Sequence, residues 1–141
     1  MSRTYIPKLL RRLVKERAGG RCEYCLIPVE FSFMVYYHID HVIAEQHDGP
    51  TSENNLAYAC PKCNQFKGSN LGTLLPGSTD IVPLYHPRED NWSDHFQLGE
   101  SGVLHPLTDA GRATIRLLDL NATDSVIMRK DLLDLSIRLS F

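Results

Sequence analysis

Four cysteines form the part of the sequence with the clearest metal-binding chemistry. They occur as two Cys-x-x-Cys pairs, Cys22 with Cys25 and Cys60 with Cys63, and 34 residues separate the pairs. The first 20 residues alternate charges with Leu and Val instead of forming the apolar run of an export signal, so we expect a cytoplasmic protein with reduced thiols. Two such pairs can supply the four thiolates of a tetrahedral structural zinc. A catalytic zinc is disfavoured, because four protein thiolates leave no position for water or substrate.

A second group of polar side chains lies between and just after the cysteine pairs. The run His38-Ile39-Asp40-His41 ends an apolar stretch, Asn55 precedes Leu56, and Asn64 and Lys67 follow the second pair. A histidine can accept a proton at neutral pH, since its ordinary pKa is about 6.5. Carboxylate and amide oxygens suit a hard divalent ion such as Mg²⁺. The segment between the cysteine pairs is therefore large enough, and polar enough, to contain a site of its own.

The order of these features resembles the HNH endonuclease family, in particular its ββα-metal members with four zinc-binding cysteines. The resemblance covers about residues 20 to 70. It implies that His41 is the general base for phosphodiester hydrolysis and that Asp40 and Asn64 hold a catalytic Mg²⁺ or Mn²⁺. It also implies that Asn55 pins the loop that orients the base. Asn64 stands where many family members have a histidine, and it still offers an oxygen ligand.

Hydrophobic periodicity and turn residues predict the elements that must position these groups. We expect an amphipathic helix over 7–18 that begins at Pro7 and stops at two glycines, and one or two strands over 31–43 that end near His41. Ser52 could cap a short helix, and a second helix is expected over 60–67. Neighbours in a regular strand point to opposite faces, so the strand must end or bulge for Asp40 and His41 to reach one phosphate.

The rest of the chain is predicted to be mainly helical. Residues 72–106 are turn-rich and suggest irregular structure with a hairpin, and Thr108 should cap a helix that runs to about residue 120. A last helix from about residue 124 carries an apolar stripe that is expected to be core, formed by Met128, Leu132, Leu135 and Leu139. The predicted class is α+β: a zinc-stabilised ββα-metal core with an N-terminal basic helix and a mainly helical C-terminal extension. With 141 residues, of which 43% are hydrophobic, the chain should form one compact unit, with the nuclease domain at 1–75 and the extension at 76–141.

Charge is distributed unevenly along the chain. The net charge is -2, yet residues 1–21 carry +6, whereas 22–76 and 77–141 each carry -4. Arg11, Arg12 and Lys15 could face phosphates, or they could form a solvated helix face. Two interpretations remain open for His38, His47 and Lys67. Each could contact the substrate, or each could be an ordinary structural residue. No apolar stretch is long enough to cross a bilayer, so no membrane partner is expected.

The favoured function is metal-dependent hydrolysis of double-stranded DNA, leaving 5′-phosphate and 3′-hydroxyl ends as the family resemblance implies. Two alternatives remain open. A non-catalytic zinc-dependent nucleic-acid-binding module would need the four cysteines but not Asp40, His41 and Asn64 together, whereas a nuclease directed at RNA would use the same site. Because a single small module has a limited contact surface, high site specificity would require a homodimer or a partner protein.

Overall fold

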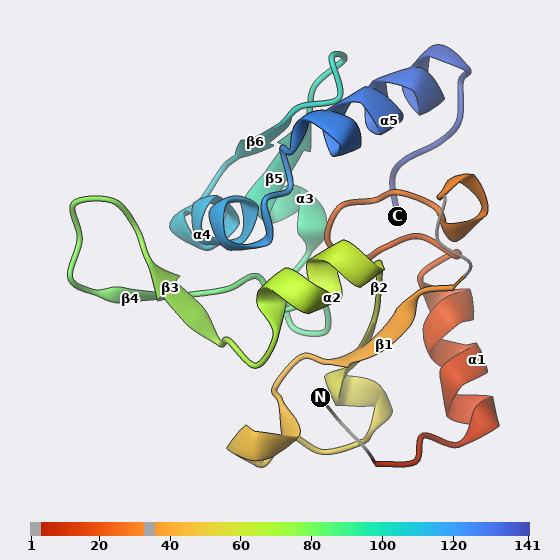
Figure 1. Cartoon of the computed structure of the whole chain (residues 1–141), viewed down its shortest axis with the longest axis vertical. Coiled ribbons are helices and arrows are strands. Elements are labelled where there is room, and N and C mark those ends of the chain that lie inside the picture. Colours follow the sequence, from red (N-terminus) through yellow and green to blue (C-terminus); the bar gives the residue numbers. More distant parts are fainter. Residues whose placement is uncertain (1–3, 33–35) are drawn as a thin grey trace.

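The computed structural model describes residues 4–32 and 36–141 (Figure 1). The N-terminal part contains α1 (Lys8–Arg17), β1 (His38–His41), β2 (Leu56–Ala59) and α2 (Pro61–Lys67). The C-terminal part contains β3 (Gly72–Leu74), β4 (Ile81–Pro83), α3 (Trp92–His95), β5 (Phe96–Leu98), β6 (Leu104–Pro106), α4 (Asp109–Leu118) and α5 (Thr123–Asp134). This mixture of helices and short antiparallel strands confirms the predicted α+β class.

The β1–β2 hairpin and helix α2 form the ββα unit of the N-terminal part. The strands pair antiparallel, with His38 opposite Ala59 and His41 opposite Leu56. Helix α2 packs against β1, whereas α1 packs against β2, and Figure 1 shows the hairpin between the two helices. All four residues of β2 are buried as a result. The hairpin thus holds the end of β1 close to α2.

The predicted strand over 31–43 is shorter in the structure. Residues Val29–Phe31 form a 3-10 turn, only His38–His41 form a strand, and residues 33–35 lie outside the described part of the chain. Strand β2 was not predicted, because a strand covered on both faces lacks the alternation of apolar and polar residues that marks a half-buried strand. Ser52 precedes a 3-10 turn, Glu53–Asn55, without a capping hydrogen bond from its side chain.

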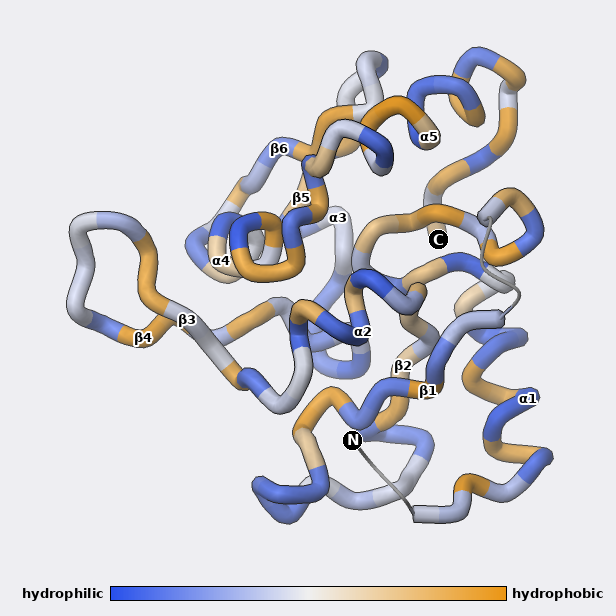
Figure 2. The backbone as a smooth tube through the Cα atoms, viewed as in Figure 1, coloured by the Kyte–Doolittle hydropathy of each residue, from blue (hydrophilic) through white to orange (hydrophobic). Residues whose placement is uncertain are grey.

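Helices α1 and α2 have the predicted ends. Helix α1 begins directly after Pro7, and Gly19 and Gly20 follow it with φ of 63° and 71°, values that favour glycine. The prediction of an amphipathic helix is only partly correct, since apolar Val14 is buried but apolar Leu9 is 78% exposed. Figure 2 shows hydrophobic and hydrophilic residues alternating along this helix. Few apolar side chains of α1 are buried, because the helix packs mainly against β2 and the 3-10 turn before it.

The C-terminal part contains two described hairpins, β3–β4 and β5–β6, where one was expected. Thr108 caps α4 as predicted, with its hydroxyl accepting a hydrogen bond from Gly111 N at 3.0 Å. The predicted core stripe on α5 is partly wrong. Leu132 and Leu139 are buried, but α5 ends at Asp134 and Leu135 is 72% exposed. The chain reverses at Ser136, which has φ of 61°, and this turn rather than helical periodicity brings Leu139 inside.

One hydrophobic core joins the two parts of the chain. It includes Val14, Cys22 and Leu56 from the N-terminal part together with Leu104 and Leu118 from the C-terminal part. None of the helices in the described ranges is long and apolar enough to span a membrane.

Arg129 of α5 fastens the C-terminal part to the first cysteine pair. Its side chain is 0% exposed, and the guanidinium donates to the carbonyl oxygens of Gly102 at 2.7 Å, Leu120 at 2.7 Å and Cys25 at 3.3 Å. Burial lowers the pKa of Arg129, while the nearby thiolates, that of Cys25 first, oppose this shift. A buried charge is costly unless it is hydrogen-bonded, so these carbonyls hold α5 in a defined position.

Candidate active site and metal centre

The four cysteines converge at the junction of the N-terminal loop with α2. All are buried, and their Sγ atoms lie within 4.8 Å of one another, with 3.8 Å between Cys25 and Cys60. A tetrahedral zinc with bonds of about 2.3 Å has sulfur–sulfur edges of about 3.8 Å, so the arrangement fits this ion. Within residues 4–32 and 36–141, no other group of three or more His, Cys, Asp or Glu side chains is placed to share an ion. The four cysteines can therefore bind a structural zinc.

Local backbone geometry holds each cysteine pair in the same way. Cys25 N lies 3.5 Å from Cys22 Sγ, and Cys63 N lies 3.4 Å from Cys60 Sγ. Cys60 is also the N-cap of α2, so the second pair forms at the start of that helix. Burial raises the pKa of the Cys22 thiol, and a bound cation would keep it ionised. This explains how two short motifs build one site once the chain brings them together.

His41 is the last residue of β1, and its side chain is only 5% exposed. Its Nε2 lies 2.8 Å from Thr51 Oγ1 and 3.7 Å from Glu45 Oε1. The strand ends at His41, as the sequence predicted. Thr51 and Glu45 both belong to the loop that connects β1 to β2, so this loop orients the ring.

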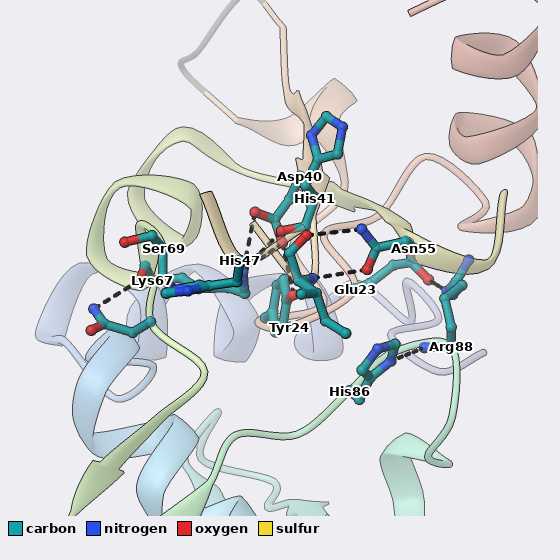
Figure 3. Close-up of polar contacts among 12 residues, drawn as sticks. Glu23, Tyr24, Asp40, His41, His47, Asn55, Lys67, Ser69, His86 and Arg88 are labelled. Atoms are coloured by element: carbon teal, nitrogen blue, oxygen red, sulfur yellow. Dashed lines mark hydrogen bonds and ion pairs between the residues drawn. The ribbon is translucent and has the colours of Figure 1, made fainter. Parts of the chain in front are cut away.

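Asp40 is 5% exposed and lies in a small buried polar cluster (Figure 3). Its Oδ2 accepts a hydrogen bond from the Tyr24 hydroxyl at 3.0 Å. Lys67 Nζ lies 3.2 Å from Oδ2 and 3.4 Å from Oδ1, and it also donates to the carbonyl oxygen of His41 at 3.2 Å. Burial raises the pKa of the Asp40 carboxyl, and the ammonium of Lys67 opposes that shift.

Lys67 and Asn64 lie on α2, the helix that faces β1. Lys67 is 1% exposed, and its ammonium contacts Asp40, while its contact with a phosphate stays a prediction. Asn64 is partly exposed and lies one turn earlier. Residues three apart on a helix share a face, so Asn64 is on the same side of α2 as Lys67.

Asn55 joins the two ends of the loop between the strands. Its Oδ1 accepts from Ile43 N, and its Nδ2 donates to the carbonyl oxygens of Ile43 and Pro50, each at 2.9 Å. Gly49 packs against the same backbone, and a Cβ there would collide with the carbonyl of Ile43. The side chain of Asn55 thus closes the loop that carries Glu45.

Replacing Asn55 with alanine should lower the free energy of unfolding by about 3 kcal/mol, because three backbone groups of Ile43 and Pro50 lose their hydrogen bonds to a buried side chain, at about 1 kcal/mol each. Urea unfolding followed by circular dichroism measures the change. The matched control is Asn54→Ala, since Asn54 is exposed and should change stability little. Equal stability of the two variants would contradict the structural role of Asn55.

None of the remaining candidates forms a hydrogen bond or ion pair with Asp40 in the part of the chain that the structure describes. His47 is exposed, and its Nε2 lies 3.1 Å from the carbonyl oxygen of Ser69 after α2. His38 is partly exposed, with its ring 6.1 Å from that of Tyr36. On α1, Arg11 donates to the carbonyl oxygen of Ile6, Arg12 pairs with Glu16 at 3.0 Å, and Lys15 is exposed.

Three polar residues of the site region escaped the sequence reasoning. Tyr24 and Glu23 lie inside the first Cys-x-x-Cys pair, and Glu23 accepts from Tyr58 N at 2.7 Å and forms an ion pair with Arg88. Thr51 follows Pro50 in the connecting loop. Nothing in the local pattern marks these residues, because each gains its role from a partner distant in the sequence.

Comparison with known proteins identifies the segment that contains the site. Residues 22–70 match the family model described as HNH endonuclease. The chain is also similar to the Septu protein PtuA of Bacillus mycoides (strain KBAB4), with 23% identity over 143 aligned positions. That alignment covers 86% of this chain and 20% of the relative, so the chain spans about a fifth of the relative's length. No solved structure gives a significant match. Residues 22–70 thus correspond to an HNH endonuclease domain.

Proposed function

We propose that this chain is a metal-dependent HNH endonuclease that hydrolyses DNA phosphodiester bonds. The observation that carries the proposal is the position of His41, which ends β1 beside Asp40 and is held by a loop that Asn55 closes. A histidine fixed in this way can take a proton from water without a rearrangement of its ring. A zinc-binding module without catalysis would have no need for such an arrangement.

In this proposal His41 accepts the proton through Nδ1. Its Nε2 faces the Thr51 hydroxyl, and the Glu45 carboxylate lies beyond at 3.7 Å from the same nitrogen. A carboxylate near Nε2 favours the tautomer that carries hydrogen on Nε2, which leaves the lone pair on Nδ1. Thr51 and Glu45 therefore orient the ring, and His41 removes the proton of the attacking water.

Asp40 and Asn64 are the residues that would hold Mg²⁺ or Mn²⁺. One carboxylate and one amide oxygen suit an ion that keeps most of its waters. Tyr24 donates to Asp40 Oδ2 at 3.0 Å, whereas Oδ1 accepts from Lys67 at 3.4 Å, which is long for a hydrogen bond, so Oδ1 is the oxygen more open to an ion. The bound ion would stabilise the extra negative charge on the phosphate during attack. The zinc, by contrast, has a structural role through sulfur ligands.

The direct test is cleavage of supercoiled plasmid by zinc-loaded protein with Mg²⁺, Mn²⁺ or EDTA. We expect nicked or linear DNA with either ion and none with EDTA. A parallel assay with RNA separates the candidate substrates, since cleavage of RNA alone would replace DNA in the proposal. Binding without cleavage of either polymer by folded, zinc-loaded protein would favour the non-catalytic module.

The basic residues of α1 are proposed to contact the DNA backbone. Replacing Arg11, Arg12 and Lys15 together with glutamine should weaken binding and reduce the slope of log affinity against log salt by about 2 to 3, at about 0.9 per lost phosphate contact. Fluorescence anisotropy between 50 and 200 mM salt, about the range where such contacts act, measures this slope.

The matched control for that triple variant changes three exposed cations elsewhere, Arg112, Arg116 and Lys130, to glutamine. These residues lie on α4 and α5, outside the matched segment. The control should retain the salt slope of the original chain. If the salt slope of the α1 variant is the same as that of the original chain, Arg11, Arg12 and Lys15 form a solvated helix face and do not contact DNA.

We further propose that residues 1–75 form the nuclease domain and that 76–141 form an extension packed on it. The shared hydrophobic core and the contact between Arg129 and Cys25 support this division of roles. A homodimer or a partner protein would add the contact surface that high site specificity requires.

A further inference from the structure

We propose that Tyr24 is a positioning residue for the divalent-ion ligand Asp40, so that the zinc-binding segment orients the catalytic ion. The Tyr24 hydroxyl holds Asp40 Oδ2 and leaves Oδ1 as the oxygen that would bind the ion. The inference rests on the proposed function, in which Asp40 binds that ion.

The Tyr24 side chain is fixed in the interior. It is 1% exposed, and its hydroxyl lies 3.0 Å from Asp40 Oδ2. Its ring packs edge-on against Tyr85 at 6.3 Å and 89°, and its carbonyl oxygen accepts from Trp92 Nε1 at 3.0 Å. A tyrosine enclosed on these sides cannot swing its hydroxyl away from the carboxylate without repacking the core.

The zinc-binding segment fixes the backbone of Tyr24 as well. Tyr24 lies between Cys22 and Cys25, whose sulfurs share one site. Its neighbour Glu23 bonds twice to Tyr58 of β2, through Glu23 N to the carbonyl oxygen at 2.8 Å and through its carboxylate to Tyr58 N. Because β2 pairs with β1, the cysteine segment and Asp40 are connected through one hydrogen-bonded hairpin.

The second group on Asp40 is the ammonium of Lys67. Its Nζ donates a long hydrogen bond to Oδ1 at 3.4 Å and lies 3.2 Å from Oδ2, so the Tyr24 hydroxyl is the shorter hydrogen-bond donor to the carboxylate (Figure 3). Hydrogen bonds of this kind orient metal-ligating carboxylates, and their loss typically costs about 10- to 100-fold in metal affinity. Tyr24 can be changed without leaving a buried charge unpaired, which makes it the better residue to test.

The test compares Tyr24→Phe with the original chain, both zinc-loaded and full length. We expect Tyr24→Phe to keep one zinc per chain and to bind Mn²⁺ about 10- to 100-fold more weakly, as measured by electron paramagnetic resonance of free Mn²⁺ without nucleic acid. In cleavage assays the Mn²⁺ concentration for half-maximal rate should rise by the same factor, while the rate at saturating Mn²⁺ should recover.

The matched control is Tyr37→Phe. Tyr37 is also buried. Its hydroxyl donates to the carbonyl oxygen of Ile27 at 3.0 Å and not to Asp40. The Tyr37→Phe variant should lose this hydrogen bond but bind Mn²⁺ as tightly as the original chain. Equal affinities in Tyr24→Phe and Tyr37→Phe would overturn the proposal, and so would loss of zinc from Tyr24→Phe, which would assign the hydroxyl to folding.

Asp40→Asn separates this inference from the proposed function. If Asp40→Asn leaves Mn²⁺ binding unchanged, the ligand assignment fails, and the role of Tyr24 fails with it. If Asp40→Asn abolishes Mn²⁺ binding and Tyr24→Phe does not weaken it, the ligand assignment stands and the positioning role alone is wrong.

Discussion

The Cys60→Ser variant should lose its zinc and unfold at least residues 20–70. Cys60 Sγ lies 3.8 Å from Cys25 Sγ and also accepts from Cys63 N at the start of α2, so one atom serves both the metal site and the helix cap. Structural zinc contributes about 10–16 kcal/mol in zinc-finger peptides, and a whole domain is stable by only about 5–15 kcal/mol. A segment of this size cannot build a core that replaces the ion.

Zinc per chain by mass spectrometry and thermal unfolding by circular dichroism measure the effect of Cys60→Ser. The control is Pro61→Ala, which changes the next residue and leaves all four thiols in place. A strong chelator added to the original chain should reproduce the unfolded state of Cys60→Ser. Unchanged zinc content and melting temperature in Cys60→Ser would remove the four-cysteine site.

The His41→Ala variant should fold and keep its zinc but cleave DNA about 10²- to 10⁴-fold more slowly, which is the usual contribution of a general base. The substitution removes one hydrogen bond, to Thr51, at a cost in stability of about 1 kcal/mol. Affinity for DNA should change little, because the imidazole is buried behind the loop and acts on water. Initial rates of plasmid nicking at saturating Mn²⁺ measure the loss.

The control for His41→Ala is His105→Ala, since His105 is exposed on β6 of the C-terminal extension. It should cleave DNA at the rate of the original chain. Turnover by His41→Ala at the original rate would show that another group accepts the proton, and loss of zinc or fold in this variant would show that His41 has a structural role.

Local signals explain which elements could be predicted. Helix α2 has a cysteine N-cap, Pro61 in its first turn and Gly68 after its end, and Thr108 caps α4 through its own side chain. Each of these signals acts within a few residues of the chain. Strand β2 lacks such a signal, because it lies against β1 and α1 with every residue of Leu56–Ala59 buried. Helical periodicity predicted a core position for Leu135. The residue is exposed because α5 ends at Asp134 and the chain turns at Ser136.

The sequence by itself determined the cysteine pairs, the order of the polar residues around them and the ends of the main helices, because caps and Cys-x-x-Cys geometry depend on neighbouring residues. Only the tertiary structure decided what Asp40 and Arg129 contact. Tyr24 and Lys67 reach Asp40 across 16 and 27 positions, and Arg129 reaches Cys25 across 104. Such contacts form where burial removes water from polar groups and forces them to find partners, and burial depends on the path of the whole chain.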